Sequence, residues 1–112
     1  MNDRLLSMLG LCRKAGKLGW GHDACLGDIK HGRARACLLM SDASDRLKRE
    51  FGRAASSGGG TVPVLQTAYT MDMIKGATGY RAGVLTVNDE GFAKKIAELH
   101  RNEEPREDFY DK

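Results

Sequence analysis

Three short apolar runs alternate with longer stretches of helical periodicity along this 112-residue chain. The runs lie at 36–41, 61–65 and 82–87 and have the length of buried strands. Pro63 stands near the start of the second run, which favours an edge or end position because proline cannot donate a hydrogen bond to a neighbouring strand. This alternation predicts an α/β chain in which helices cover both faces of a sheet.

Apolar side chains spaced three and four residues apart mark the first helix. The stripe consists of Leu5, Met8, Leu9 and Cys12. Gly16 and Gly19 are expected to end this helix. A second helix is predicted to follow directly, beginning at 22–23, where Asp23 can accept hydrogen bonds from the free backbone N–H groups of the first turn. Gly32 is expected to end it in a left-handed conformation.

Three further helices are predicted between and after the apolar runs. One begins at Asp42 or Ser44, either of which can cap it, and continues to about Ala55. A short helix spans 67–76, and the last helix begins at Asn88 as its cap. The expected order is two helices followed by three strand–helix pairs. This order predicts a three-layer α/β/α sandwich.

Length and charge limit what the chain does. We expect one domain over residues 1–100, followed by an acidic, flexible tail at 101–112. No apolar run reaches the roughly 20 residues of a membrane-spanning helix, and no signal-peptide pattern is present, so a cytoplasmic protein is expected. Residues 1–60 carry 11 basic and six acidic side chains, which suggests an anionic partner for the first half.

The reactive residue types form no recognisable catalytic or metal-binding pattern. Cys12, Cys25 and Cys37 have the spacing of neither a disulfide framework nor a metal clip, and are expected to be buried thiols. The three histidines form no closely spaced metal-binding pair. No nucleophile is paired with a base. We therefore expect no enzyme activity, no metal and no cofactor.

The stretch KLGWGHDACLGD at 17–28 has two functional interpretations. Gly19, Gly21 and Ala24 fit the G-x-G-x-x-G/A spacing of a dinucleotide-binding turn, and Asp42 lies about 20 residues further on. That turn requires a preceding strand, whereas the segment before Gly19 has helical periodicity. The glycines could instead open a helix whose N-terminus binds phosphates of a nucleic acid. A tight turn between two helices, without function, also fits them.

Several stretches of the chain resemble the ribosomal protein L7Ae/L30e family, in its bacterial branch. The similarity covers roughly residues 4–98 and is carried by LLSMLGLCRKAGKLGWGHDACLGDIKHGRARACLLMSDAS, VPV and NDEGFAKKI. Its most specific part is GLCRKAGKL. The resemblance implies an L30e-like α/β/α sandwich. It also implies binding to structured RNA, such as kink-turns or bulged stems, within ribosomes or other ribonucleoproteins.

The resemblance implies that the start of the second helix contacts RNA. In kink-turn-binding members, a G-x-N-E stretch and a later lysine read guanine edges. Gly21 matches this pattern, but Asp23, Ala24 and Gly27 stand where asparagine, glutamate and lysine are usual. Because each good base contact contributes about 1–3 kcal/mol of discrimination, these differences are expected to weaken kink-turn specificity.

The loop before the last strand is the second RNA contact that the resemblance implies. Within GATGYRAG at 76–83, Arg81 matches a common arginine, and Tyr80 is a candidate for stacking on an unpaired base. Trp20 either packs the turn or stacks on a base. The basic side chains that flank the second helix are expected to bind phosphates; they are Lys14, Lys17, Lys30, Arg33 and Arg35. The candidate RNA-binding residues are Lys14, Lys17, Gly21, His22, Asp23, Lys30, Arg33, Gly79, Tyr80 and Arg81.

Three hypotheses of different classes follow. The first is a cytoplasmic protein that docks on structured RNA, of ribosomal or other ribonucleoprotein origin, with ribosomal or other proteins as further partners. The second is an L7Ae-like scaffold that has lost kink-turn reading and binds a protein, which the residues at 23, 24 and 27 favour. The third is a small nucleotide-binding protein. Arg46, Arg49 and Arg53 are interpreted as a solvated helix face in all three.

Overall fold

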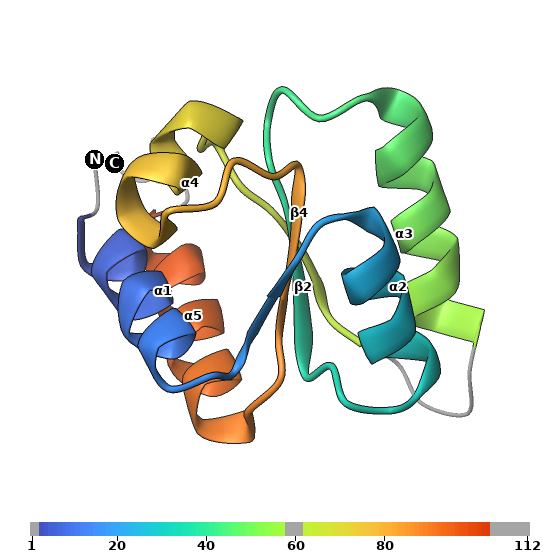
Figure 1. The fold of residues 1–112 in the computed structure, drawn as a ribbon, viewed down its shortest axis with the longest axis horizontal. Coiled ribbons are helices and arrows are strands. Elements are labelled where there is room, and N and C mark those ends of the chain that lie inside the picture. The colour runs from blue at the N-terminus through green and yellow to red at the C-terminus, as the bar shows by residue number, and fades with distance from the viewer. Residues whose placement is uncertain (1–2, 58–61, 104–112) are drawn as a thin grey trace, which may run out of the picture.

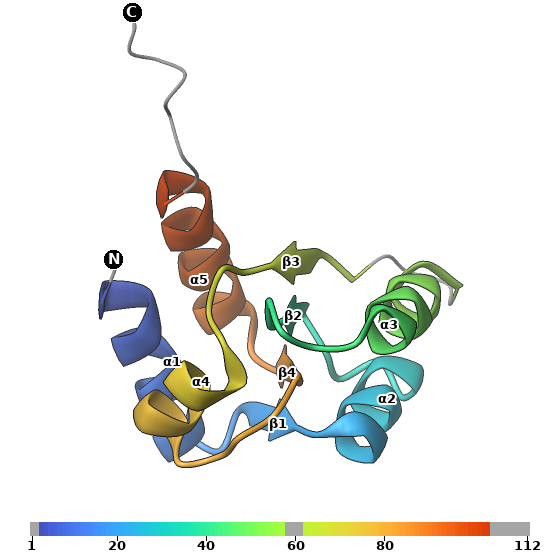
Figure 2. The same cartoon turned by 90° about the horizontal axis from the view of Figure 1, so that it is seen from above.

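The computed structural model describes residues 3–57 and 62–103. Within these residues the elements are α1 (Asp3–Lys14), β1 (Leu18–Trp20), α2 (His22–Lys30), β2 (Ala36–Leu39), α3 (Asp45–Ser57), β3 (Val64–Gln66), α4 (Met71–Thr78), β4 (Val84–Val87) and α5 (Glu90–Glu103). The sheet is the middle of three layers, with α1, α4 and α5 on one face and α2 and α3 on the other (Figures 1 and 2). The predicted three-layer α/β/α sandwich is confirmed.

The strands lie in the order β1-β4-β2-β3. β4 is antiparallel to both of its neighbours, with Val87 opposite Leu18 of β1 and Ala36 of β2. β2 and β3 are parallel. β3 therefore forms one edge of the sheet, as Pro63 immediately before it predicts, and the Pro63 carbonyl accepts a hydrogen bond from the Cys37 N–H at 2.9 Å.

β1 contradicts the prediction of two consecutive helices. α1 ends in a turn at Gly16, which has a φ of 74°, and the Lys17 N–H closes this turn by donating to the Cys12 carbonyl at 3.0 Å. Residues 18–20 then form the opposite edge strand of the sheet. Three residues are too few to reveal a period of two, and the pairing partner of β1 lies far along the chain.

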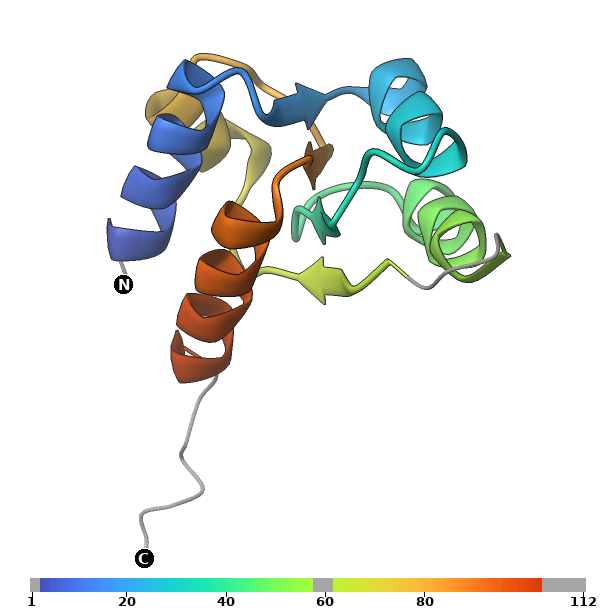
Figure 3. The same ribbon diagram turned by 90° about the horizontal axis from the view of Figure 1, so that it is seen from below.

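Each helical layer packs its own hydrophobic core against the sheet. The larger core lies under α1, α4 and α5 and includes Leu5, Leu9, Ile74, Leu85 and Ile96. α1 and α5 lie side by side over it (Figure 3). The smaller core lies under α2 and α3 and consists of Cys25, Cys37, Leu39, Phe51 and Val84. Since each buried large apolar side chain contributes about 1.5–3 kcal/mol, both layers are held firmly against the strands.

The three cysteines are buried and unpaired, as predicted. Burial raises the pKa of the Cys12 thiol to about 11 and the pKa values of Cys25 and Cys37 to about 12. Thiols with such pKa values stay protonated at neutral pH and are poor nucleophiles. Among the described residues, no group of three or more histidine, cysteine or acidic side chains is arranged to hold a metal ion.

The helices between the strands begin where capping side chains are available. Ser44 accepts a hydrogen bond from the Leu47 N–H at 3.1 Å, so it caps α3 as one of the two predicted alternatives. α4 begins at Met71 and not at residue 67, because Thr70 supplies the cap by accepting from the Met73 N–H at 3.2 Å.

The last helix is capped by Asp89 and not by Asn88. The Asp89 carboxylate accepts from the Phe92 N–H at 2.9 Å, whereas the Asn88 amide donates to Asp28. α5 continues to Glu103, and the remaining residues of the predicted tail, 104–112, lie outside the described part of the chain. In the described part, no helix has the length and apolarity needed to cross a membrane.

Candidate nucleic-acid interface

Two segments that are distant in sequence meet beside edge strand β1. They are the start of α2 and the loop 79–83 between α4 and β4 (Figure 2). The Gly21 N–H donates to the Val84 carbonyl at 3.2 Å. The rings of Trp20 and Tyr80 stack with centroids 3.5 Å apart and an angle of 4° between their planes. This region and the basic residues toward the other end of β1 are together named the β1 edge surface, which comprises Arg13, Lys14, Lys17, Trp20, Gly21, His22, Asp23, Lys30, Arg33, Gly79 and Tyr80.

The start of α2 presents backbone N–H groups toward solvent. Gly21 is the N-cap, and its φ of 91° favours glycine strongly over other residues. A glycine cap has no side chain to accept hydrogen bonds. The first bond within the helix runs from the Cys25 N–H to the Gly21 carbonyl at 3.1 Å, so residues 22–24 have no acceptor inside α2. Free donors of this kind attract anions.

Two carboxylates lie at the same helix start and oppose that attraction. His22 Nδ1 lies 2.9 Å from the Asp23 carboxylate, and Nε2 lies 3.0 Å from Glu50 of α3. Hydrogen bonding to Asp23, and next to Glu50, raises the pKa of His22. A protonated His22 offsets one of the two negative charges. The start of α2 is therefore a surface of mixed charge and not a simple anion site.

Arg13 joins the aromatic pair, a contact that sequence analysis did not anticipate. Its guanidinium carbon lies over the Tyr80 ring, 4.8 Å from the centroid. Since Trp20 covers one face of Tyr80, Arg13 covers the other. Tyr80 therefore has no open face in this structure, and the stacking predicted for it would require a rearrangement. Trp20 keeps 41% of its surface exposed.

The predicted phosphate-binding residues lie toward the other end of β1. All are exposed side chains at the ends of α1 and α2 or in the turns that follow: Lys14, Lys17, Lys30, Arg33 and Arg35, of which Arg35 lies 3.8 Å from the Glu90 carboxylate. The Lys17 carbonyl accepts the Asn88 N–H at 2.8 Å, which fixes the turn against the end of β4. Arg33 also lies near Asn88, because both side chains donate to Asp28, Arg33 from Nε at 3.0 Å. This end of β1 is thus bordered by basic groups.

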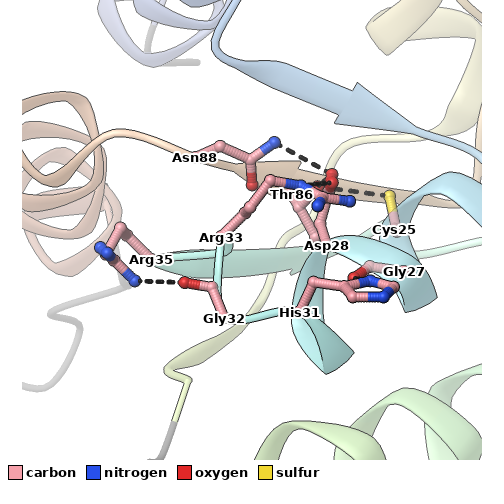
Figure 4. Close-up of polar contacts among 9 residues, drawn as sticks. All are labelled: Cys25, Gly27, Asp28, His31, Gly32, Arg33, Arg35, Thr86 and Asn88. Carbon is pink, nitrogen blue, oxygen red and sulfur yellow. Dashed lines mark hydrogen bonds and ion pairs between the residues drawn. The ribbon is translucent and has the colours of Figure 1, made fainter.

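A buried carboxylate anchors the basic end of the surface to the sheet. Asp28 is only 8% exposed. It accepts hydrogen bonds from the Thr86 hydroxyl at 2.7 Å, the Asn88 amide at 2.9 Å and Arg33 (Figure 4). Burial alone would raise the pKa of Asp28, but the hydrogen bonds from Asn88, Thr86 and Arg33 outweigh it and lower the pKa below its ordinary value. Asp28 is accordingly ionised at neutral pH.

Gly19 faces this carboxylate, which bears on the dinucleotide interpretation. A Cβ at Gly19 would collide with Asp28 Oδ2 and the Thr86 hydroxyl oxygen. The predicted helix is present as α1, but it ends at Lys14, and the short strand β1, which was not predicted, precedes α2. However, that strand lies antiparallel to its neighbour β4, and a pyrophosphate approaching Gly19 would meet a buried negative charge. The geometry therefore disfavours a dinucleotide turn, for a different reason from the one inferred from sequence.

Of the predicted RNA-binding residues in the loop after α4, Gly79 and Tyr80 belong to the β1 edge surface and Arg81 does not. Gly79 ends α4 with a φ of 89°, and its N–H donates to the Lys75 carbonyl at 2.8 Å. This left-handed residue sets the direction in which the chain continues to Tyr80. Arg81 lies apart from the β1 edge surface, because its Nε donates to Asp72 in the first turn of α4 at 2.7 Å.

A cavity of about 660 Å³ lies beside the C-terminal end of α2. Its walls come from α2, α3, α5 and the segments that lead into β2 and β3, and include Ile29, Ala55, Pro63 and Ala93. Of the residues predicted to contact RNA, Lys30 and Arg35 line it. The cavity is separate from the glycines at 19 and 21, so it adds no support for a nucleotide bound at those glycines.

Comparison with known proteins finds a relative of similar sequence and solved structures of similar fold. No family model matches the chain. It is 29% identical over 96 residues to the RNA-binding protein YlxQ of Enterococcus faecium, covering 86% of this chain and 90% of that protein. A solved structure of a protein with unknown function from Bacillus halodurans C has a TM-score of 0.81 and 28% identity, covering 89% of this chain and 99% of the other.

A more distant structure supports the fold. The Giardia lamblia 15.5kD RNA binding protein has a TM-score of 0.69 at 16% identity, and the match covers 91% of this chain and 89% of that one. These matches confirm the resemblance to the L7Ae/L30e family that was inferred from the sequence. The chain is similar to the YlxQ-type, bacterial branch of the L7Ae/L30e family and has an L30e-like fold.

Proposed function

We propose that this L7Ae/L30e-like chain binds structured RNA through the β1 edge surface. One observation carries the proposal: the two segments implicated by the family resemblance, the start of α2 and the loop 79–83, lie together there. Gly21, the cap of α2, donates to Val84 directly after the loop, and Trp20, next to Gly21, stacks on Tyr80 of the loop. The name of the YlxQ relative, which matches over most of both chains, supports RNA as the class of partner. Ribosomal or another ribonucleoprotein RNA in the cytoplasm is the proposed target.

Contacts to phosphates provide most of the affinity in this proposal. Lys14, Lys17 and Lys30 are exposed, and none of them forms an ion pair with a described residue. Arg33 is held by Asp28 through Nε, which leaves its outer guanidinium nitrogens for a phosphate. Contacts of this kind orient a protein on RNA without reading its sequence. The backbone N–H groups of residues 22–24 add one further place for a phosphate.

The side chains at the start of α2 contribute little recognition of RNA base edges. Asp23 can accept hydrogen bonds from a guanine edge, but Ala24 and Gly27 have no polar side chain. The Gly27 carbonyl is also occupied, because His31 Nδ1 lies 2.8 Å from it. Two of the reading positions therefore contribute no base discrimination. We infer that the chain recognises the shape of a widened or bulged stem more than its sequence.

Fluorescence anisotropy on two labelled RNAs tests the proposal. A kink-turn and a plain duplex of equal length are titrated across a salt series. We expect both to bind at low salt, with an affinity that falls steeply as salt rises. Lys14→Ala and Lys17→Ala should each reduce the slope of log affinity against log salt by about 0.7–0.9. Arg53→Ala is the matched control, because it removes one positive charge from α3, next to the opposite edge of the sheet (Figure 2).

Three outcomes would contradict the proposal or part of it. Strong kink-turn preference that persists at about 0.15 M salt, where charges are screened within about 8 Å, would mean that Asp23 and its neighbours form an alternative reading set. Lack of affinity for either RNA, together with a protein partner that co-purifies after nuclease treatment, would support the scaffold hypothesis. Saturable mononucleotide binding without RNA binding would support the nucleotide hypothesis.

A further inference from the structure

Trp20 is more exposed than its position in β1 predicts. Leu18 and Trp20 point to the same face of the sheet, because side chains alternate along a strand. Leu18 is 8% exposed, whereas Trp20 is 41% exposed. Among the described residues, Leu11 is the other large hydrophobic side chain classed as exposed. With one face of the indole against Tyr80 at 3.5 Å, this exposure comes from the other face and the ring edges.

The ring beneath Trp20 is held in place by the end of α4. The Tyr80 N–H donates to the Thr78 hydroxyl oxygen at 3.1 Å, and that hydroxyl donates to the Ile74 carbonyl at 2.8 Å. Thr78 is itself buried, so this anchor is rigid. Arg13 covers the far face of Tyr80. The three side chains thus form a column, with Arg13 from α1, Tyr80 from the loop 79–83 and Trp20 from β1. The open end of this column is the Trp20 side chain.

An aromatic face that is already oriented can bind a planar ring at low entropic cost. Stacking of nucleobases on such faces needs no hydrogen-bond pattern, since every base has a flat face of its own. Gly21, next in sequence, has no side chain to crowd the indole, and the exposed Lys14 and Lys17 precede it on the same surface. Arg13 is the basic group next to the aromatic pair, and the phosphates of nucleotides that follow a stacked base would extend along the surface toward Lys14 and Lys17.

We propose that the open face of Trp20 is a stacking site for one unpaired nucleobase. The proposal rests on the proposed function, because the base belongs to the bound RNA. It assigns binding of a base to Trp20 and a supporting role to Tyr80 and Arg13, which orient the indole without touching the base.

The chain has a single tryptophan, so its fluorescence reports on this site alone. The probes are two RNA hairpins with the same stem, one with an oligoadenylate loop and one whose loop nucleotides are abasic. Both keep the loop phosphates, but only the first offers unpaired bases. We expect the adenylate hairpin to quench the tryptophan emission. We also expect it to bind about 5- to 150-fold more tightly than the abasic hairpin, the range measured for single base–aromatic stacks.

Variants separate stacking on a base from a merely structural Trp–Tyr contact. Trp20→Ala should bind both hairpins with the affinity that the wild-type protein has for the abasic one. Trp20→Phe, which keeps a smaller ring and is expected to fold normally, should retain part of the preference. Leu11→Ala, at the other exposed hydrophobic side chain, should leave the preference unchanged.

The failure of this inference can be distinguished from failure of the proposed function. Equal affinity of the wild-type protein for both hairpins, with unchanged tryptophan emission, overturns the stacking site and leaves RNA binding intact. Lack of binding to either hairpin at low salt overturns both. The comparison of the two hairpins uses wild-type protein, so it holds even if Trp20→Ala fails to fold.

Discussion

The charge of Asp28 and the residue type at position 19 are both determined by the side chains packed around that carboxylate. The carboxylate stays ionised although it is buried, because three donors surround it. Its oxygen occupies the space that a side chain at position 19 would need. The glycine there is thus required by packing, whereas the sequence alone allows it to be read as part of a phosphate-binding motif.

Replacing Gly19 by alanine should destabilise the fold. The added methyl group must displace Asp28 or Thr86, and overpacking of this kind costs about 1–3 kcal/mol. The free energy of unfolding in urea measures the effect. Gly52→Ala in α3 is the control, because a Cβ there meets no neighbouring atom and alanine is favoured over glycine in a helix by about 0.5–1 kcal/mol. Equal stability of the two variants would contradict the packing argument.

His22 should titrate above its ordinary range. Hydrogen bonds to Asp23 and then Glu50 raise its pKa from 6.5. A raised folded-state pKa means that the ionic contribution to stability is fully present below the unfolded pKa and is lost as pH rises through the folded pKa. NMR titration of the imidazole should give a pKa above 6.5, and Glu50→Gln should lower it. The same pKa in wild-type protein and variant would show that Glu50 does not hold the ring.

At the scale of elements, the sequence predicts what is local and fails where partners are distant. The apolar stripe of α1 and the Ser44 cap of α3 are each visible within a few residues of sequence, and both are found. β1 is missed because its three residues acquire strand structure only by pairing with β4. Asn88 and Asp89 are both good caps, and the choice between them depends on Asp28, which recruits the Asn88 amide from another element.

In the candidate site too, some residues were identified from the sequence and others were found only in the structure. Gly21 and Tyr80 were identified through family resemblance, and the structure brings their segments together. Arg13 was not identified, because no spacing in the sequence links the end of α1 to a loop after α4. Arg81 follows the expected motif but pairs with Asp72. Contacts among three elements cannot be deduced from the sequence around any one of them.

The start of α2 should be sensitive to any residue other than glycine at position 21. With φ at 91° and ψ at 163°, an alanine costs about 1–3 kcal/mol of backbone strain. We expect Gly21→Ala to lower the free energy of unfolding by this amount and to weaken RNA binding, since the exposed N–H groups follow it. Gly27→Ala, inside α2 with room for a methyl group, should be neutral or stabilising. A Gly21→Ala protein as stable as wild type would contradict the cap assignment.

At the scale of the whole molecule, the alternation of apolar runs and helical stretches was sufficient to predict three layers. It was not sufficient to predict strand order, because β4 lies between β1 and β2, and insertion of the last strand between earlier ones leaves no mark on local sequence. The predicted domain limit at residue 100 and the tail beyond it stay predictions.

This strand order also has a consequence for the growing polypeptide. In the described sheet, β1 has β4 as its one neighbour, and Leu18 lies opposite Val87. Contacts between residues so far apart in sequence form late and slow folding. During translation, β1 remains unpaired until β4 has left the ribosomal exit tunnel, after four of the five helices have been made. The chain therefore gains its β1 edge surface only after β4 has been made, and a nascent fragment without β4 does not yet have it.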